Sequence, residues 1–288
     1  MSALAEKLAS ALASREDRNI RRRLPSPDLS LSQPSPITTI TANAAAEAIA
    51  MTTSPAIVPS APDPPITPVD FSSNDYLSLA TSSNLRARVL AALQKAPLIL
   101  GSGGSRLLVH SAAHAALEAR LARTFRAPAA LLFNSGFDAN AGFFACIPQT
   151  GDALLHDEMI HASVHDGARA SRGGRRRSFA HNDVRALREA LCALRDECPA
   201  LREGTASVFV AVESVYSMDG SVAPLCAMLD TMDAVFPAGN AHMVVDEAHA
   251  TGLYGPRGKG LVALLGVEDR VLARLHTFGK ALAASGGA

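Results

Sequence analysis

The 288-residue chain lacks the features that mark several large classes of protein. Lys+Arg and Asp+Glu both number 27, so no excess of positive charge is available to bind nucleic acid or an anionic membrane surface. No apolar run approaches the roughly 20 residues that a membrane-spanning helix needs. The charged residues Glu6, Lys7 and Arg15 near the N-terminus are not typical of a secretory signal. We therefore expect a soluble, cytoplasmic protein that binds neither nucleic acid nor membrane. The alternative of a targeting signal for an organelle stays open.

Cysteine is scarce, and two common catalytic motifs are absent. The four cysteines form no C-x-x-C pair, which favours a reducing compartment where they act as small apolar residues. The sequence has no G-x-S-x-G turn and no G-x-x-x-x-G-K-[ST] loop, so the residues that define α/β-hydrolase-type serine hydrolases and P-loop proteins are lacking. The histidines of HDEMIHASVH (156–165) also miss the H-E-x-x-H spacing, and we predict no metal site there.

Composition divides the chain into three segments. Residues 1–24 have helical spacing of apolar residues, and Pro25 ends that segment. Residues 25–69 are rich in Pro, Ser, Thr and Ala and are predicted to be a linker or an irregular insertion. Residues 70–288 are predicted to form a large domain that binds a cofactor.

Short apolar segments alternate with helical ones in residues 70–288. The predicted strands are 127–134, 151–157, 175–181, 206–214, 241–249 and 270–279, and the predicted helices are 111–124, 136–147, 160–171, 183–196 and 222–236. This alternation is typical of βαβ units, so we predict an α/β fold with a mainly parallel sheet flanked by helices. In such sheets, ligands bind beyond the carboxyl ends of the strands.

Polar residues follow the apolar segments at the predicted ends of the strands. Asp246 ends the VVD stretch of one strand, where a carboxylate can pair with a cation such as a protonated ring nitrogen. Lys280 follows the last strand among small residues, and desolvation there would supply the neutral amine of Schiff-base chemistry. Two stretches could bind a phosphate, GSGGSR (101–106) and NSGFDAN (134–140); we favour the second because it leads from a strand into a helix.

Eight motifs occur along residues 70–288 in the order of a known family. They are SSNDYLSL (72–79), GSGGSRLL (101–108), FNSGFDAN (133–140), HDEMIHAS (156–163), FAHND (179–183), ESVYSMDGSVAPL (213–225), VDEAHATGLYGPRGKG (245–260) and HTFGKAL (276–282). Together they resemble the α-oxoamine synthases, which are fold-type I enzymes dependent on pyridoxal 5′-phosphate (PLP). The resemblance implies the large PLP-binding domain of that fold.

The resemblance also implies a role for individual residues. Lys280 is the Schiff-base lysine that later moves the Cα proton, Asp246 pairs with the pyridinium nitrogen, and His161 stacks on the ring. The residues expected at the phosphate end are Ser135, Gly136, Phe137 and Thr277, those on the ring hydroxyl side are Ser217 and His249, and those for substrate carboxylates are Asn74 and, more weakly, Arg21.

The implied reaction is a decarboxylative condensation of an amino acid with an acyl-CoA. The sequences of the GSGGSR and FAHND motifs most resemble those of the family branch that joins L-alanine and pimeloyl-CoA to give 8-amino-7-oxononanoate in biotin synthesis. The resemblance further implies a homodimer whose partner subunit completes the site. Family members continue past their lysine into a small C-terminal domain, and we expect that domain to be missing from this chain.

Two alternatives remain open on the sequence. The first is a truncated, catalytically silent protein that keeps the PLP fold. The second is another fold-type I PLP enzyme, either an aldolase or lyase or a related oxoamine synthase, that shares the Asp246 and Lys280 pair.

Overall fold

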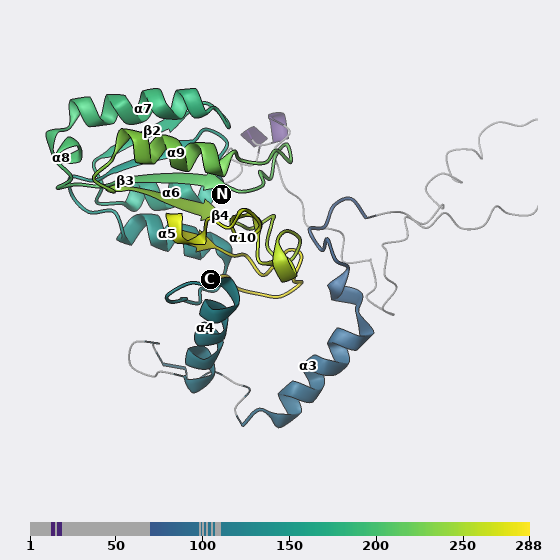
Figure 1. Cartoon of the computed structure of the whole chain (residues 1–288). Helices are drawn as coiled ribbons and strands as arrows, with labels where there is room; N and C mark the ends of the chain where they lie inside the picture. The colour runs from purple at the N-terminus through teal and green to yellow at the C-terminus, as the bar shows by residue number, and fades with distance from the viewer. Residues whose placement is uncertain are drawn as a thin grey trace, which may run out of the picture. The chain divides into compact units, whose positions relative to one another are not determined.

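The structure is a computed structural model that describes two parts of the chain. The described residues are 13–14, 16–18, 70–97, 99, 101, 103–104, 106 and 111–288. The chain divides into two units, Met1–Asp70 and Phe71–Ala288, and each is considered by itself (Figure 1). In the first unit, residues 13–14 and 16–17 are helical, within the helix predicted for residues 1–24. Arg21 and the predicted linker 25–69 lie outside the described residues.

The second unit contains a sheet of five parallel strands. They are β1 (Ala153–Asp157), β2 (Arg175–Phe179), β3 (Val208–Glu213), β4 (Ala241–Asp246) and β5 (Val271–Leu275). The strand order is β2-β1-β3-β4-β5, and every neighbouring pair is parallel. The predicted α/β fold is therefore confirmed. The order reverses between β1 and β3, which is where an open parallel sheet forms a crevice at the carboxyl ends of its strands.

Helices connect the strands. They are η1 (Leu79–Thr81), α3 (Ser83–Lys95), α4 (Ala112–Phe125), α5 (Gly136–Cys146), α6 (Ala162–Ala170), α7 (Val184–Glu197), α8 (Pro199–Arg202), α9 (Leu225–Val235), η2 (Pro256–Gly258), α10 (Leu261–Leu265) and η3 (Glu268–Arg270). Among the described residues, no helix is both long and apolar enough to cross a membrane.

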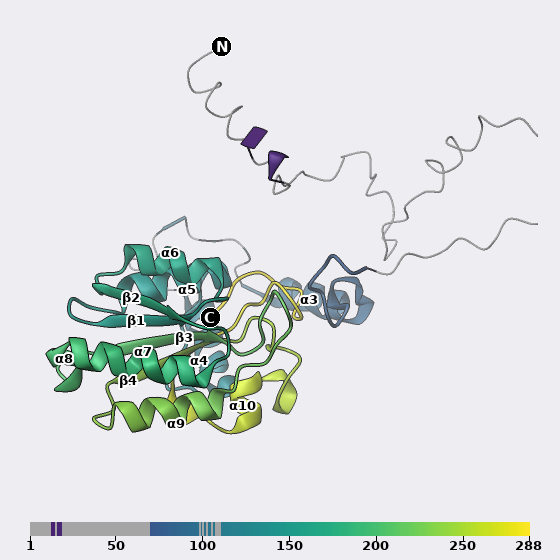
Figure 2. The ribbon, with the colours of Figure 1, turned by 90° about the horizontal axis from the view of Figure 1, so that it is seen from above.

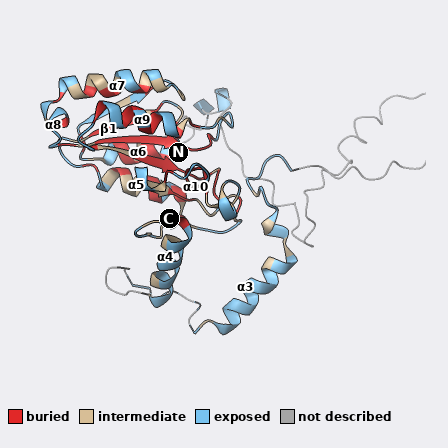
Figure 3. Ribbon diagram, in the orientation of Figure 1, coloured by how far each residue is buried: buried red, intermediate tan, exposed pale blue. Residues whose placement is uncertain are grey.

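The sheet lies between two layers of helices. Helices α7 and α9 cover one face and α5 and α6 cover the other, as the two views show (Figures 1 and 2). Side chains alternate between the faces, since Val210 packs in the core with α7 and α9 whereas its neighbour Ala211 packs in the core with α5 and α6. All six residues of β3 are buried, as expected for a central parallel strand (Figure 3).

Polar side chains cap the helices that begin at the carboxyl edge of the sheet. Ser135 accepts a hydrogen bond from the Asp138 N–H and caps α5. Asp183 accepts from the N–H groups of Arg185 and Ala186 and caps α7. These caps fix where each helix begins, close to the strand end that precedes it.

The segment 127–134 differs from its prediction as a strand. It makes isolated bridges instead, with Phe133 pairing antiparallel to Gly287 and the following Ser135 pairing with Gly286. Its apolar residues satisfy the sequence pattern of a strand, but a β-ladder also requires an adjacent strand that pairs with it along its length. The only segment paired with it in the described part of the chain is the short stretch 286–287.

Candidate active site at the carboxyl edge of the sheet

Lys280 lies in the loop that follows β5, at the carboxyl edge of the sheet. Its Nζ is 2.9 Å from Nε2 of His249, and the side chain is partly buried. Burial lowers the pKa of Lys280, although the nearby carboxylates of Asp246 and Glu213 act in the opposite direction. A lowered pKa increases the fraction of neutral amine, which is the form that attacks a carbonyl carbon.

Asp246 is the last residue of β4, and its carboxylate is held from two sides. Its Oδ2 accepts a hydrogen bond of 2.6 Å from Nδ2 of Asn140 in α5, and its Oδ1 accepts one of 2.9 Å from the Ala248 N–H. Only 6% of Asp246 is exposed. The carboxylate is thus fixed at the strand end, where a cationic ligand group could pair with it.

A chain of hydrogen bonds runs from Lys280 to Asn74. Nδ1 of His249 is 2.8 Å from the Tyr76 hydroxyl, and that hydroxyl donates to Oδ1 of Asn74 at 3.0 Å. Burial, followed by the positive charge of Lys280, lowers the pKa of His249 to about 4, so the imidazole is neutral near pH 7. The assignment consistent with all three bonds puts the proton on Nδ1 and leaves Nε2 to accept from Lys280.

The N-terminus of α5 lies against Thr277, in the loop that carries Lys280. A Cβ placed on Gly136 would come within 1.9 Å of Oγ1 of Thr277, so only glycine allows this approach. The first backbone N–H groups of a helix have no acceptor within the helix, and they form a ready site for an anion. Ser135, Gly136 and Thr277 therefore form a small polar cradle, and Phe137 is partly exposed beside it.

His161 and Phe137 face one another near this cradle. Their rings meet edge to face with centroids 6.1 Å apart. His161 is exposed and caps α6, where its Nδ1 accepts from the Ser163 N–H at 3.2 Å. His161 also acts electrostatically on His249, as the smallest of the causes that lower the pKa of His249.

Ser217 lies in an exposed loop after β3, and Glu213 at the end of that strand anchors it. Oε2 of Glu213 accepts from the Ser217 N–H at 3.3 Å. Glu213 pairs in register with Asp246 on β4, and only 3% of it is exposed. Burial, followed by the charge of Asp246, raises the pKa of Glu213 to about 7.

Sequence reasoning assigned no role to three of these residues. Tyr76 lies inside the SSNDYLSL motif and Glu213 opens ESVYSMDG, so their positions in motifs were the available signals. Asn140 ends the FNSGFDAN motif, but that position does not reveal its hydrogen bond to Asp246, which lies 106 residues away.

Two features lie apart from this crevice. The ring of His156 meets that of His165 edge to face, but no group of three or more potential metal ligands occurs among the described residues. A cavity of about 970 Å³ lies between α4, α5 and the β5 edge, and Lys280, Asp246 and His249 do not line it. Convergent polar groups, and not cavity size, thus identify the candidate site.

Comparison with known proteins gives a consistent picture. Residues 66–288 match the family described as aminotransferase class I and II. The chain is 53% identical over 225 residues to 8-amino-7-oxononanoate synthase of Emericella nidulans, covering 77% of this chain and 55% of that protein. It is 47% identical over 220 residues to aminoacyl transferase sphA of Aspergillus fumigatus, covering 76% of this chain and 47% of that protein.

Solved structures show the same relationship. Serine palmitoyltransferase of Sphingomonas wittichii superimposes with a TM-score of 0.64 at 30% identity, over 75% of this chain and 50% of that one. 8-Amino-7-oxononanoate synthase from Francisella tularensis gives a TM-score of 0.56 at 26% identity, over 76% of this chain and 57% of that one. The chain spans about half the length of the curated relatives it matches.

Proposed function

Because the chain belongs to the aminotransferase class I and II family and, within it, to the α-oxoamine synthases, we propose that it takes part in a PLP-dependent condensation of an amino acid with an acyl-CoA. The proposed substrates are L-alanine and pimeloyl-CoA, and the proposed product is 8-amino-7-oxononanoate, a biotin precursor. The observation that carries the proposal is the placement of the Lys280 amine beside His249, near the fixed carboxylate of Asp246.

The residues at the carboxyl edge fit the cofactor PLP. Lys280 offers an amine of lowered pKa for the aldehyde, and Asp246 offers a carboxylate for the ring nitrogen. The approach of Gly136 to Thr277 leaves a hydroxyl beside the N-terminus of α5, where the phosphate would be bound. His161, exposed in the same crevice, is available to stack on the ring.

Each of these residues has a defined task in the proposed reaction. When bound, PLP withdraws electrons from the Cα of the amino acid and so makes its proton acidic. Lys280 removes that proton, and Asp246 keeps the ring nitrogen protonated. His249, neutral at pH 7, accepts a hydrogen bond from Lys280 and directs the amine. Asn74 is proposed to bind the amino-acid carboxylate, and Arg21 is a weaker candidate for an acidic group of the substrate.

The bond changes balance without a further reactant. Cα, after losing its proton, would form a C–C bond with the thioester carbonyl carbon while the C–S bond breaks, and CoA would leave as a thiolate that takes a proton from water. Loss of CO2 breaks the bond to the carboxyl carbon, and a proton replaces it to leave an amino ketone.

We predict that Lys280→Ala removes the visible absorbance that the protein acquires on incubation with PLP. The amine is the only proposed covalent link to the cofactor, so a variant without it cannot form the absorbing species. Absorption spectra of the dialysed protein provide the measurement. Lys95→Ala, in the exposed helix α3, is the matched control and should keep the absorbance. A wild-type protein that stays colourless with PLP would contradict the proposal.

A second candidate is a related oxoamine synthase that uses another amino acid and acyl thioester. The similarity to aminoacyl transferase sphA and to serine palmitoyltransferase favours it. Release of CoA from a panel of amino acids and acyl-CoA thioesters separates the two, since the first proposal expects the highest rate with alanine and pimeloyl-CoA. Bound PLP without turnover of any pair would support a catalytically silent protein. Cleavage of hydroxyamino acids without CoA would support an aldolase or lyase.

A further inference from the structure

The loop formed by residues 214–224 joins β3 to α9 and carries Ser217. It closes on itself, because the Tyr216 N–H donates to the Ser221 carbonyl at 2.9 Å and the Ala223 N–H donates to the Ser214 carbonyl at 3.1 Å. Residues 217–220 at its tip are exposed, and Met218 is 79% exposed. An exposed tip needs anchors if it is to hold a ligand group in place.

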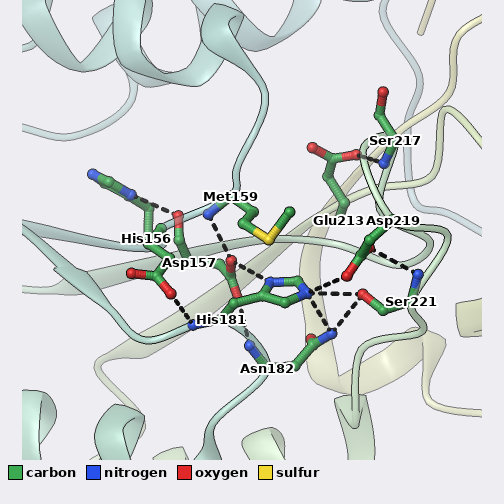
Figure 4. A network of polar contacts seen from close by, with 10 residues as sticks. His156, Asp157, Met159, His181, Asn182, Glu213, Ser217, Asp219 and Ser221 are labelled. Carbon is green, nitrogen blue, oxygen red and sulfur yellow. Dashed lines mark hydrogen bonds and ion pairs between the residues drawn. The ribbon is translucent and has the colours of Figure 1, made fainter.

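One such anchor begins at Asp157, the last residue of β1 (Figure 4). This carboxylate is 0% exposed and accepts from the N–H groups of Met159 at 2.9 Å and Asn182 at 2.8 Å. Its Oδ1 also lies 2.8 Å from Nδ1 of His181. The buried carboxylate therefore fixes both the proton on Nδ1 and the direction of the imidazole ring.

The other edge of the same imidazole contacts the loop. Nε2 of His181 lies 2.8 Å from Oγ of Ser221 and 3.3 Å from Oδ2 of Asp219. The side-chain amide of Asn182 lies 2.9 Å from the same Ser221 hydroxyl and 3.1 Å from Nε2 of His181. With its oxygen turned towards them, this amide accepts from the protonated Nε2 and satisfies an oxygen that otherwise has no partner among the described residues. Two successive residues after β2 thus connect the loop to the carboxyl ends of β1 and β2, as Figure 4 shows.

Charged and titratable groups surround His181 on several elements. Asp157 comes from β1, Asp219 from the loop, Glu158 accepts from the His181 N–H at 2.9 Å, and the Tyr216 ring packs against the imidazole at 4.4 Å. Burial alone would lower the pKa of His181, but the hydrogen bond and charge of Asp157, with those of Asp219, outweigh it and raise the pKa.

The order Asp157–His181–Ser221 has the connectivity of a hydrolase triad, but its charges favour another role. A general base must be neutral when it takes the proton of the hydroxyl. Here a second carboxylate, Asp219, faces the same Nε2 and favours the protonated imidazole. Protonated His181 donates at both nitrogens and joins Asp157 to the loop.

We propose that His181 is a positioning residue that latches the loop 214–224 to the sheet and thereby places Ser217 at the cofactor site. The part that concerns Ser217 rests on the proposed function, whereas the latch itself does not. The latch is complete while His181 is protonated, and it weakens as the pH rises through the pKa of His181.

Hydrogen–deuterium exchange of the protein without added PLP tests the latch directly. In His181→Gln, we expect amide exchange in residues 214–224 to rise about tenfold, the effect of losing a charge-assisted hydrogen bond. Exchange in β3 should stay unchanged. His165→Gln removes a histidine of α6 outside the network and should leave the loop as in the wild type. An unchanged loop in His181→Gln, or an equal rise throughout β3, would overturn the proposal.

A second variant covers the case in which His181→Gln fails to fold. Ser221→Ala removes the contact on the loop and leaves the buried Asp157–His181 pair in place. It should raise exchange in the loop by severalfold, again without a change in β3. A loop as protected as in the wild type would contradict the latch.

The pH dependence distinguishes a charged latch from a passive contact. After correction for intrinsic exchange rates, the wild-type loop should lose protection as the pH rises through the pKa of His181. His181→Gln should show no such step. A step of equal size in both proteins would rule out His181 as its source.

Binding of PLP then tests the link to Ser217. His181→Gln should weaken PLP binding about tenfold while borohydride still attaches the cofactor to Lys280. If the loop loosens and PLP affinity is unchanged, the latch stands but its role at the cofactor site is wrong. If the wild type binds no PLP, the proposed function fails while the exchange result remains interpretable.

Discussion

Glu213 and Asp246 are neighbours across β3 and β4, and both are buried. Two carboxylates this close do not ionise independently, because each negative charge disfavours the other. Asp246 has two hydrogen-bond donors that stabilise its charge, Asn140 and the Ala248 N–H. Glu213 has weaker hydrogen-bond donors, such as the Ser217 N–H at 3.3 Å, and its pKa is raised to about 7. Glu213 is therefore only partly ionised near neutral pH.

This arrangement predicts how stability depends on pH. In the unfolded chain Glu213 has its ordinary pKa, so the folded protein binds an extra proton between about pH 4.5 and 7 and loses stability as the pH rises through that window. Glu213→Gln cannot ionise, so its unfolding temperature should fall less between pH 5 and 8 than that of the wild type. The difference should correspond to at most about 3 kcal/mol in the free energy of unfolding. Thermal unfolding without PLP, with the exposed Glu203→Gln as control, measures this difference. Parallel curves for Glu213→Gln and the wild type would contradict it.

Candidate site residues were predictable where a residue type has few uses at a strand end. Asp246 and Lys280 were selected this way, and the structure places both at the carboxyl edge of the sheet, while the roles assigned to them stay predictions. The contacts that tune them were not predictable, because they join distant positions. The Tyr76 hydroxyl reaches His249 across 173 residues, and no local pattern encodes that pairing.

At the scale of elements, the carboxyl edge depends on how closely α5 approaches the loop after β5. Helix α5 begins at Gly136, and Thr277 occupies the space that a side chain there would need. The order of strands and helices could be predicted because hydrophobic periodicity is local. The 127–134 segment shows the limit of this reasoning, since its apolar residues match a strand but pairing depends on a neighbour.

Gly136→Ala should separate these two elements. The new Cβ would lie 1.9 Å from Oγ1 of Thr277, so the helix or the loop must shift. We expect PLP affinity to fall at least about tenfold and stability to fall by about 1–3 kcal/mol, as for other overpacked sites. Titration with PLP and thermal unfolding measure the two effects. Gly174→Ala, whose new Cβ meets nothing within 4 Å, is the control. An unchanged PLP affinity in Gly136→Ala would show that this contact does not shape the phosphate end.

At the scale of the whole molecule, helix α3 presents an apolar face that no described residue buries. It buries none of its 13 residues and is drawn in the colours of exposed and intermediate residues (Figure 3). Helical spacing places Val89, Leu90 and Leu93, each close to half exposed, on one side of it. Helices of this length are marginal in water without packing partners. The homodimer implied by the resemblance to the α-oxoamine synthases stays a prediction, and we propose that its interface covers this face.

The dimer predicts a mass twice the 30.0 kDa of the chain. Replacing Leu90 and Leu93 by glutamate together should shift the protein towards the monomer, because the buried apolar face would then carry charge. Arg88→Glu with Ala91→Glu alters the opposite side of α3 and should leave the dimer intact. Sedimentation equilibrium gives the masses. A monomeric wild type, or a dimer that survives both pairs of substitutions, would contradict an interface through α3.

The central claim is that Lys280 links PLP covalently, and peptide mapping after borohydride reduction tests it most directly. Reduction converts the lysine–cofactor bond into a stable secondary amine that survives digestion and mass spectrometry. The account predicts a single phosphopyridoxyl-modified peptide that contains Lys280, and none in Lys280→Ala. Modification spread over other lysines, or no modified peptide in the wild type, would contradict it.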